Sequence, residues 1–132
     1  MRIGADHPDR GMPDRPFRIL LVEDHDVTRI ALSIWLADLG YQVVVAESAT
    51  VALRTVDHTE FDLLISDVNL PDGSGLELVK RLRERQQFPA IAISGVIGRD
   101  ERDLARAAGF SDLLEMPLDR AGFVEKIKAF VK

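Results

Sequence analysis

The sequence predicts an α/β fold, a doubly wound sheet of five parallel strands with helices on both of its faces. Two observations lead to this class. Short apolar runs alternate five times with segments whose apolar residues recur at helical spacing. Each run is about five residues long, which suits the strands of a small sheet. Strict alternation of strand and helix favours parallel strands joined by right-handed helical crossovers.

The first two strand–helix units follow from apolar spacing. Residues 18–22 form a short, mostly apolar run, as expected for a strand that is covered on both faces. Residues 27–39 are expected to form a helix that Gly40 ends as a cap. The valine-rich residues 42–46 form the second strand, and a serine opens the second helix, residues 48–58. The apolar positions that define the spacing of the first helix are Val27, Ile30, Ala31 and Ile34.

The third unit contains a loop of typical turn residues. Residues 61–66 form the third strand, which ends at Asp67. Residues 71–75, with the sequence Pro-Asp-Gly-Ser-Gly, are expected to form a loop. A third helix over residues 76–85 follows that loop.

Two further units complete the sheet. Residues 90–93 and 112–115 are the fourth and fifth strands, and a helix over residues 99–108 separates them. Gly109 closes that helix, and Asp119 caps the last helix of the chain.

The first sixteen residues differ in composition from the rest of the chain. They contain three of the six prolines, two glycines and an alternation of Asp and Arg. Such a segment buries too little apolar surface to offset the entropy lost on ordering it. We therefore expect residues 1–16 to be a flexible arm or inter-domain linker, and residues 17–132 to form one domain.

Composition and charge exclude several classes of protein. The 132 residues are 46% apolar, and no apolar run approaches the roughly 20 residues of a membrane-spanning helix. The absence of cysteine excludes disulfides, zinc–thiolate sites and cysteine nucleophiles. A net charge of −5 without a basic block disfavours nucleic-acid binding. The N-terminus lacks the apolar core of a signal peptide, so we expect a cytoplasmic protein.

Carboxylates follow the first and third predicted strands. Glu23 and Asp24 come directly after the first strand, and Asp67 ends the third. If these strands are neighbours, the three carboxylates converge at the sheet edge where such folds bind ligands. Carboxylates this close repel unless a cation or protons intervene, and oxygen ligands of this kind suit Mg²⁺. We expect Asp26 to cap the following helix and His25 to be a loop residue, because Mg²⁺ prefers oxygen.

The motifs at the strand ends, taken in order, resemble the receiver domain of two-component response regulators and hybrid histidine kinases. They are the acidic pair in residues 19–24 (ILLVED), residues 67–77 (DVNLPDGSGLE) and residues 92–95 (AISG). The resemblance extends over residues 17–132. It implies the flavodoxin-like (βα)5 fold with strand order 2-1-3-4-5.

The resemblance also implies roles for individual residues. Asp67 would be the phosphoacceptor, whose carboxylate attacks a phosphohistidine of a partner histidine kinase or phosphotransfer domain. Asp24 and Asp67 would hold Mg²⁺ directly, with the backbone carbonyl of Asn69 as a third protein ligand. Glu23 would reach the metal directly or through water, and Ser94 would donate its hydroxyl to a phosphoryl oxygen. These residue types suit the chemistry, because a carboxylate is a competent nucleophile once the transferring group is neutralised.

Two positions depart from the family pattern. Members of the family carry a lysine before the proline that follows the fifth strand, and this chain has Met116 there. A methionine cannot form the ion pair with a phosphoryl group. Leu113 stands where the family often has a switch aromatic residue. We interpret Arg99, near the end of the fourth strand, as a solvated helix-start residue, with a replacement cation as the alternative.

Three functions follow from these patterns. The first is a phosphoacceptor receiver, which is not a separate enzyme, and the second is a degenerate receiver that acts as a phosphorylation-independent interaction module. The third, a phosphohydrolase of the haloacid dehalogenase type, requires a second aspartate two residues after the nucleophile. That position is Asn69, whose amide cannot exchange a proton in this way.

The sequence says less about the protein to which this domain belongs and about the partner that it contacts. The chain ends directly after the last predicted helix, so we expect either a stand-alone regulator or a receiver domain of a hybrid kinase. The wide apolar face of the first helix is expected to add to the core, with docking of a partner helix as the alternative. The residues that widen it are Leu32, Trp35 and Leu36.

Overall fold

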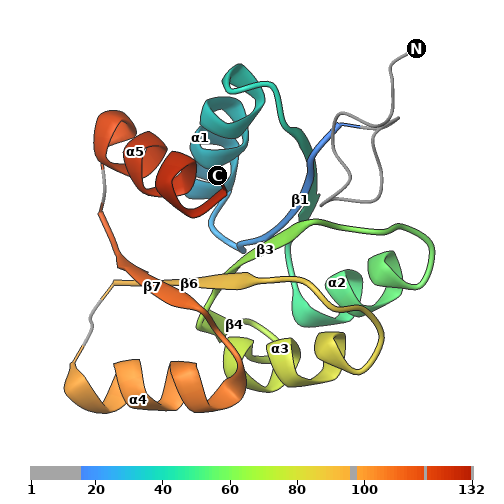
Figure 1. The fold of residues 1–132 in the computed structure, drawn as a ribbon. Coiled ribbons are helices and arrows are strands. Elements are labelled where there is room, and N and C mark those ends of the chain that lie inside the picture. The colour runs from blue at the N-terminus through green and yellow to red at the C-terminus, as the bar shows by residue number, and fades with distance from the viewer. Residues whose placement is uncertain (1–15, 96–97, 118, 132) are drawn as a thin grey trace.

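In the part of the chain that the structure describes, five parallel strands form the central sheet (Figure 1). The computed structural model describes residues 16–95, 98–117 and 119–131, so the expected arm, residues 1–16, lies outside the described residues except for its last position. The strand order is β2-β1-β3-β6-β7, which is the predicted order 2-1-3-4-5 once two short strands outside this sheet are set aside. The strands are β1 (Arg18–Val22), β2 (Gln42–Ala46), β3 (Leu63–Asp67), β6 (Ala90–Ser94) and β7 (Asp112–Glu115).

Among the described residues, five helices cover the two faces of the sheet (Figure 1). The two that lie together on one face are α1 (Asp26–Asp38) and α5 (Arg120–Val131). The three on the other face are α2 (Ala49–Val56), α3 (Gly75–Arg83) and α4 (Arg99–Ala108). This is the doubly wound arrangement that the alternation of strands and helices predicts. None of the helices in the described ranges is long and apolar enough to cross a membrane.

The core is divided by the sheet into two layers because successive strand residues point to opposite faces. In β1, Ile19 and Leu21 belong to the layer under α1 and α5, whereas Leu20 and Val22 belong to the layer under α2, α3 and α4. All four side chains are fully buried. The strand is therefore apolar throughout, as predicted for a strand that is covered on both faces.

The predicted caps at Ser48 and Gly40 are present. The Ser48 side chain accepts a hydrogen bond from the Val51 amide at the start of α2. Gly40 has φ +95°, a backbone conformation that favours glycine. Its amide donates to the Ala37 carbonyl, and the following Tyr41 amide donates to Leu36. This pair of hydrogen bonds is the Schellman arrangement that ends a helix.

The expectation that Leu32, Trp35 and Leu36 of α1 add to the core is confirmed, whereas most of the positions that defined the helical spacing are exposed. Leu32 and Leu36 are the side chains that face the core, with 1% and 0% exposure, and Trp35 packs on Phe123 of α5 with ring centroids 5.8 Å apart. The positions that defined the spacing include three exposed side chains, Val27 (82%), Ile30 (54%) and Ile34 (52%). The helix has two apolar stripes, and periodicity alone does not indicate which of them faces the sheet.

Two local expectations also need correction. Asp26 is the first residue of α1 rather than its cap; the capping position is His25, and Asp26 forms an ion pair with Arg29 at 2.6 Å. The expected loop over residues 71–75 is part of an antiparallel hairpin of β4 (Asn69–Leu70) and β5 (Gly73–Ser74). Strands of two residues are too short to show an alternating pattern.

Candidate functional site

The register of the sheet brings the predicted acidic residues together. Val22, the last residue of β1, is level with Ser66 of β3. The residues that follow them, Glu23 and Asp67, therefore lie side by side at the carboxyl edge of the sheet. This is the edge where ligands bind in open α/β sheets.

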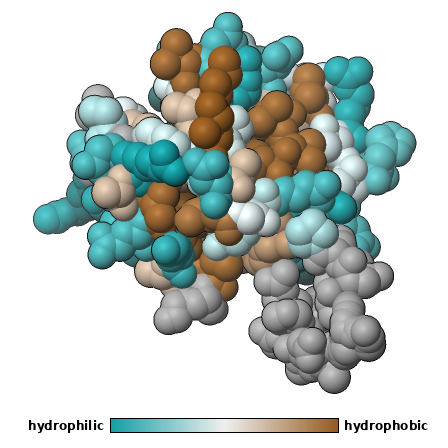
Figure 2. Space-filling view, turned by 90° about the horizontal axis from the view of Figure 1, so that it is seen from above, coloured by the Kyte–Doolittle hydropathy of each residue, from teal (hydrophilic) through white to brown (hydrophobic). Residues whose placement is uncertain are grey.

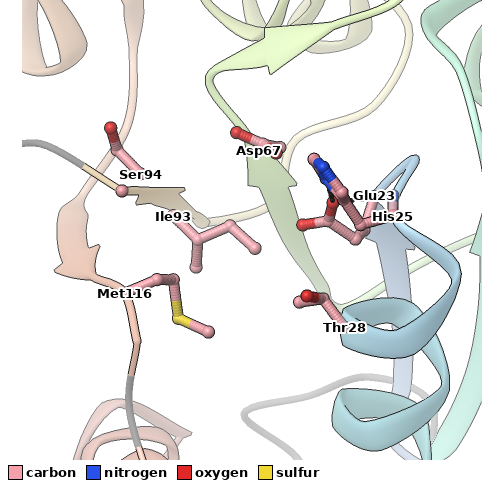
Figure 3. Close-up of a pocket in the computed structure, with 8 residues that line it drawn as sticks. Glu23, His25, Thr28, Asp67, Ile93, Ser94 and Met116 are labelled. Atoms are coloured by element: carbon pink, nitrogen blue, oxygen red, sulfur yellow. Dashed lines mark hydrogen bonds and ion pairs between the residues drawn. The ribbon is translucent and has the colours of Figure 1, made fainter.

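A pocket of about 230 Å³ opens at this edge (Figure 3). In the close-up, Glu23, His25 and Thr28 lie on one side, Ser94 and Met116 lie on the other, and Asp67 lies between them at the end of β3. The pocket thus collects residues that follow four different strands. Its lining residues are Glu23, His25, Thr28, Asp67, Ile93, Ser94, Gly95 and Met116.

The environment of Asp67 opposes its ionisation. Burial raises the pKa of its carboxyl group above the ordinary aspartate value, and the charge of Asp24 raises it further. The backbone amide of Asn69 opposes this effect, since it donates to Asp67 Oδ1 at 3.1 Å and lowers the pKa. One carboxylate oxygen is thereby held by the backbone of the chain.

Glu23 is the most deeply placed acid of the site. It is only 3% exposed, and burial raises its pKa, with further contributions from the charges of Asp67 and Asp24. The His25 amide donates to Glu23 Oε2 at 3.0 Å and lowers the pKa in part. Two neighbouring acids with raised pKa values indicate a site that gains stability when a cation binds.

Asp24 supplies an atom that fits a metal ligand. Its Oδ1 is inaccessible to solvent, and no hydrogen-bond donor within the described part of the chain reaches it. A buried carboxylate oxygen without a donor is costly unless a cation meets it. One ligand atom from each of Glu23, Asp24, His25 and Asp67 lies within 4.8 Å of the others. The donor set of three carboxylates matches the oxygen preference of Mg²⁺, so the residues fit this ion.

The other two predicted site residues lie at the same edge. Ser94 is the last residue of β6, is 4% exposed and lines the pocket, as expected from its position. Asn69 begins β4, and its described contact with the site is the amide that donates to Asp67. Its carbonyl remains a predicted metal ligand.

The positions that we expect to depart from the family pattern have different environments. Met116 lines the pocket, and its amide donates to the Ser94 carbonyl at 2.7 Å, which couples the ends of β6 and β7. Leu113 is 9% exposed and packs in the core layer under α4. Arg99 is exposed and is not among the residues that line the pocket.

Arg29 is a site residue that the sequence analysis missed. Its guanidinium donates to the backbone carbonyls of Glu23 at 3.1 Å and Asp24 at 3.4 Å, and it pairs with Asp26. The side chain is only 15% exposed. Arg29 therefore fixes the loop that carries the acidic pair. Its signal in the sequence is weak, because an arginine in the first turn of a helix is ordinary on a solvated surface.

His25 was expected to be a loop residue, and the structure places it in the carboxylate cluster. Its ring Nδ1 lies 3.3 Å from Glu23 Oε2 and 3.6 Å from Asp24 Oδ1. The ring makes no capping hydrogen bond to α1, although His25 occupies the capping position. The available signal was its place directly after the acidic pair.

Gly75 allows the hairpin to fold back on Asp67. A Cβ at this position would lie 2.1 Å from the Asp67 carbonyl oxygen and 3.0 Å from the Cα of Val68. The Gly75 amide donates to the Val68 carbonyl at 2.7 Å. The absence of a side chain at Gly75 is therefore what allows α3 to begin against the backbone of Asp67.

Comparison with known proteins identifies the class to which this fold and site belong. The family model of the response regulator receiver domain matches residues 19–128. The chain belongs to this family, and it is a receiver domain of two-component signal transduction.

Three similar proteins illustrate the range of the family. The chain is 33% identical to the TorCAD operon transcriptional regulatory protein TorR of Escherichia coli K12, over 86% of its own length and 49% of TorR. It is 33% identical to the aerobic respiration control sensor protein ArcB of the same organism, over 90% of its length and 16% of ArcB. The chemotaxis protein CheY4 of Vibrio cholerae has the same fold, with a TM-score of 0.83 at 27% identity over 87% of this chain and 98% of that one. The chain thus spans about half of TorR and a smaller part of ArcB.

Proposed function

We propose that Asp67 accepts a phosphoryl group from a phosphohistidine, with Mg²⁺ held by the neighbouring acids. The observation that supports this most strongly is the position of Asp67 between Glu23 and Ser94 in one pocket, with Asp24 in the same carboxylate cluster. Asp24 and Asp67 are the proposed direct ligands, with the Asn69 carbonyl as a third, and Glu23 reaches the ion directly or through water. Bound there, Mg²⁺ supplies positive charge that neutralises the phosphoryl oxygens.

Few residues of the protein take part in the phosphoryl transfer. A carboxylate oxygen of Asp67 forms a bond to phosphorus while the phosphorus–nitrogen bond to histidine breaks, and the electron pair returns to the imidazole. Because the Asn69 amide holds Oδ1 of Asp67, we assign Oδ2 as the attacking oxygen. The Ser94 hydroxyl donates to a phosphoryl oxygen from the far side of the pocket. The domain is the acceptor in this step and needs no separate enzymatic activity.

The proposed partner is a histidine kinase or a phosphotransfer domain. Three exposed side chains of α1, which we call the α1 stripe, lie three and four residues apart and therefore on one face of the helix: Val27, Ile30 and Ile34. Thr28, the next residue after Val27, lines the pocket, so the stripe begins beside the pocket. Figure 2 looks down on α1 and α5 and shows hydrophobic side chains exposed on this face. A helix that carries a phosphohistidine would bury the α1 stripe while it presents the phosphoryl group to Asp67.

Intact mass spectrometry tests the acceptor. The protein, incubated with a small phosphodonor and Mg²⁺, should gain the mass of one phosphoryl group, and Asp67→Asn should gain none. Asp103→Asn, an exposed acid on α4, is the matched control and should be modified like the wild type. Phosphorylation of the Asp67→Asn protein, or equal phosphorylation of the wild type in excess chelator, would contradict the assignment.

A second function is favoured by Met116. This residue lines the pocket at the position where the family carries a lysine, so it offers no positive charge to a phosphoryl group. Met116 leaves the proposed nucleophile and metal ligands in place, so we expect its main effect on the response of the surrounding loops. The second candidate is therefore a receiver that binds its output partner with little dependence on phosphorylation.

A further inference from the structure

The carboxylate cluster contains a nitrogen donor as well as oxygen donors. Nδ1 of His25 belongs to the same group of ligand atoms as the carboxylates of Glu23, Asp24 and Asp67. In Figure 3 the His25 side chain turns toward the Asp67 side of the cluster. The ring makes no capping hydrogen bond to α1, and its Nδ1 instead forms a hydrogen bond with Glu23 Oε2 at 3.3 Å.

The distances suit a shared metal ion. In an octahedral site, ligand atoms that lie about 2.1 Å from the ion are about 3.0 Å apart when they are neighbours and about 4.2 Å apart when they face each other across the ion. The 3.3 Å and 3.6 Å separations of His25 Nδ1 from Glu23 Oε2 and Asp24 Oδ1 are close to the adjacent value. All four ligand atoms lie within 4.8 Å of one another, which is slightly more than the separation of two ligands on opposite sides of an ion. A small contraction of the loop around an ion therefore places all four ligand atoms within reach.

The backbone already holds His25 in this place. Its amide donates to Glu23 Oε2 at 3.0 Å, and its carbonyl accepts a hydrogen bond from the Arg29 amide at 2.8 Å. The Arg29 guanidinium fixes the carbonyls of Glu23 and Asp24 just before it. The ring itself is 76% exposed, so a hydrated ion can approach it from solvent.

We infer that His25 is a nitrogen ligand of the metal site, and that it gives this receiver a preference for first-row transition ions such as Ni²⁺ over Mg²⁺. Imidazole nitrogen binds Ni²⁺, Cu²⁺ and Zn²⁺ well, whereas Mg²⁺ is bound by oxygen and water. A site of three carboxylates without the imidazole would have a smaller preference for Ni²⁺, Cu²⁺ and Zn²⁺ over Mg²⁺. The inference rests on the metal site of the proposed function, but it does not require that Asp67 be phosphorylated.

Calorimetric titration with each metal alone tests the inference. The wild type should bind Ni²⁺ more tightly than Mg²⁺, and His25→Ala should weaken Ni²⁺ binding at least about tenfold. The affinity for Mg²⁺ should change less than about twofold, since Mg²⁺ gains little from the imidazole. The control is His58→Ala, outside the cluster, which should leave Ni²⁺ affinity unchanged.

Two outcomes would overturn the inference. If His25→Ala leaves Ni²⁺ affinity unchanged, the ring is not a ligand. If it weakens Ni²⁺ and Mg²⁺ equally, His25 acts only by holding the loop. A spectroscopic readout separates these roles further, because Mn²⁺ bound to the wild type should show a nitrogen hyperfine coupling by pulsed EPR that His25→Ala lacks. The phosphorylation test with Asp67→Asn is independent, so either proposal can fail while the other stands.

Discussion

At the scale of single residues, Gly75 sets how closely α3 approaches the backbone of Asp67. We predict that Gly75→Ser destabilises the fold by at least about 1–3 kcal/mol, the usual cost of overpacking. A Cβ would lie 2.1 Å from the Asp67 carbonyl, and backbone atoms cannot yield as the end of a flexible side chain does. The gain of replacing a helical glycine, about 0.5–1 kcal/mol, is smaller than this cost. Urea unfolding measures the difference.

Gly98→Ser is the matched control for this prediction. Gly98 caps α4, and a Cβ there would meet nothing within 4 Å. A serine is favoured at such a position, so this variant should be as stable as the wild type or more stable. Equal stability of the Gly75→Ser and Gly98→Ser proteins would show that α3 can shift away from Asp67 without cost.

Sequence patterns predicted some site residues and missed others. The two groups differ in whether their roles depend on residue type and strand position or on backbone geometry. Glu23, Asp24 and Asp67 were predictable because they follow apolar strands, and the strand order then brings them together. Arg29 was missed, since its hydrogen bonds to loop carbonyls depend on backbone geometry that residue types do not specify. His25 was judged by the oxygen preference of Mg²⁺, and its distance to Glu23 became known only from the structure.

At the scale of elements, α2 begins with help from a residue of the β4–β5 hairpin. The first turn of α2 has no acidic residue of its own. The Asp72 carboxylate accepts from the amides of Ala49 and Thr50, each at 2.9 Å, and from the Thr50 hydroxyl at 2.5 Å. These hydrogen bonds lower the pKa of Asp72 from 3.8 to about 2, with the Thr50 side chain as the largest cause. The hairpin that follows Asp67 is thereby tied to α2.

This contact predicts a pH-dependent contribution to stability. A folded-state pKa below the unfolded value means that folding favours the ionised form, so the contribution is complete above pH 3.8 and is lost as the pH falls toward about 2. At neutral pH the wild type should therefore unfold at a higher urea concentration than Asp72→Asn. The difference between their urea midpoints should disappear as the pH falls from 3.8 to about 2. Asp103→Asn, which removes the same charge from α4, controls for net charge. A gap of constant size from pH 7 to pH 2 would contradict the assignment.

The α1 stripe allows a prediction about partner recognition. Ile30→Asp should slow phosphotransfer from a cognate histidine kinase by roughly tenfold or more, the effect expected for an anchoring residue of an interface. Phosphorylation by a small phosphodonor should stay at the wild-type rate, because Ile30 does not line the pocket. Leu104→Asp is the matched control, since Leu104 on α4 is 56% exposed and Ile30 is 54% exposed. An equal loss with both donors would mean that Ile30 acts on the fold or the pocket.

The same helix shows what sequence patterns leave undecided at this scale. Periodicity predicted that residues 27–39 form a helix, and the observed bounds agree within one residue at each end. It could not choose between the row that contains Leu32 and Leu36 and the row that contains Val27 and Ile34. The choice depends on how α1 packs on β1 and α5, and α5 contributes Phe123 to the contact with Trp35. Such packing is a tertiary property that the local sequence does not encode.

At the scale of the whole molecule, alternation of strands and helices was sufficient to predict the sheet. Five parallel strands in the order β2-β1-β3-β6-β7 follow from right-handed crossovers together with the resemblance to receiver domains. The β4–β5 hairpin was not predictable, because two-residue strands leave no periodic pattern. The hairpin matters for the site, since it carries Asn69 and Asp72 and leads directly to Gly75.

In the proposed function, phosphorylation of Asp67 changes the shape of the whole domain, and Met116 bears on this conversion. A phosphoryl group adds about −1.5 to −2 charges at neutral pH. In this pocket the residue beside Ser94 that would meet that charge is a methionine, whose amide joins the end of β7 to β6. A ligand shifts a two-state equilibrium only by its different affinity for the two states. Without the ion pair, this difference should shrink by about 1.5–3 kcal/mol, or roughly ten- to a hundredfold in population.

We therefore predict that beryllofluoride, a mimic of the phosphoryl group, changes the amide chemical shifts of this domain only near Asp67. Met116→Lys restores the charge, and its response should extend from the end of β6 to the end of β7. Met116→Leu is the matched control, because it keeps an apolar side chain of similar volume and should respond like the wild type. Large amide shifts from Ser94 to Met116 in the wild type, unchanged in Met116→Lys, would show that another group meets the phosphoryl charge. Because the Met116 amide donates to the Ser94 carbonyl in the backbone, all three proteins keep the connection through which such a response would travel.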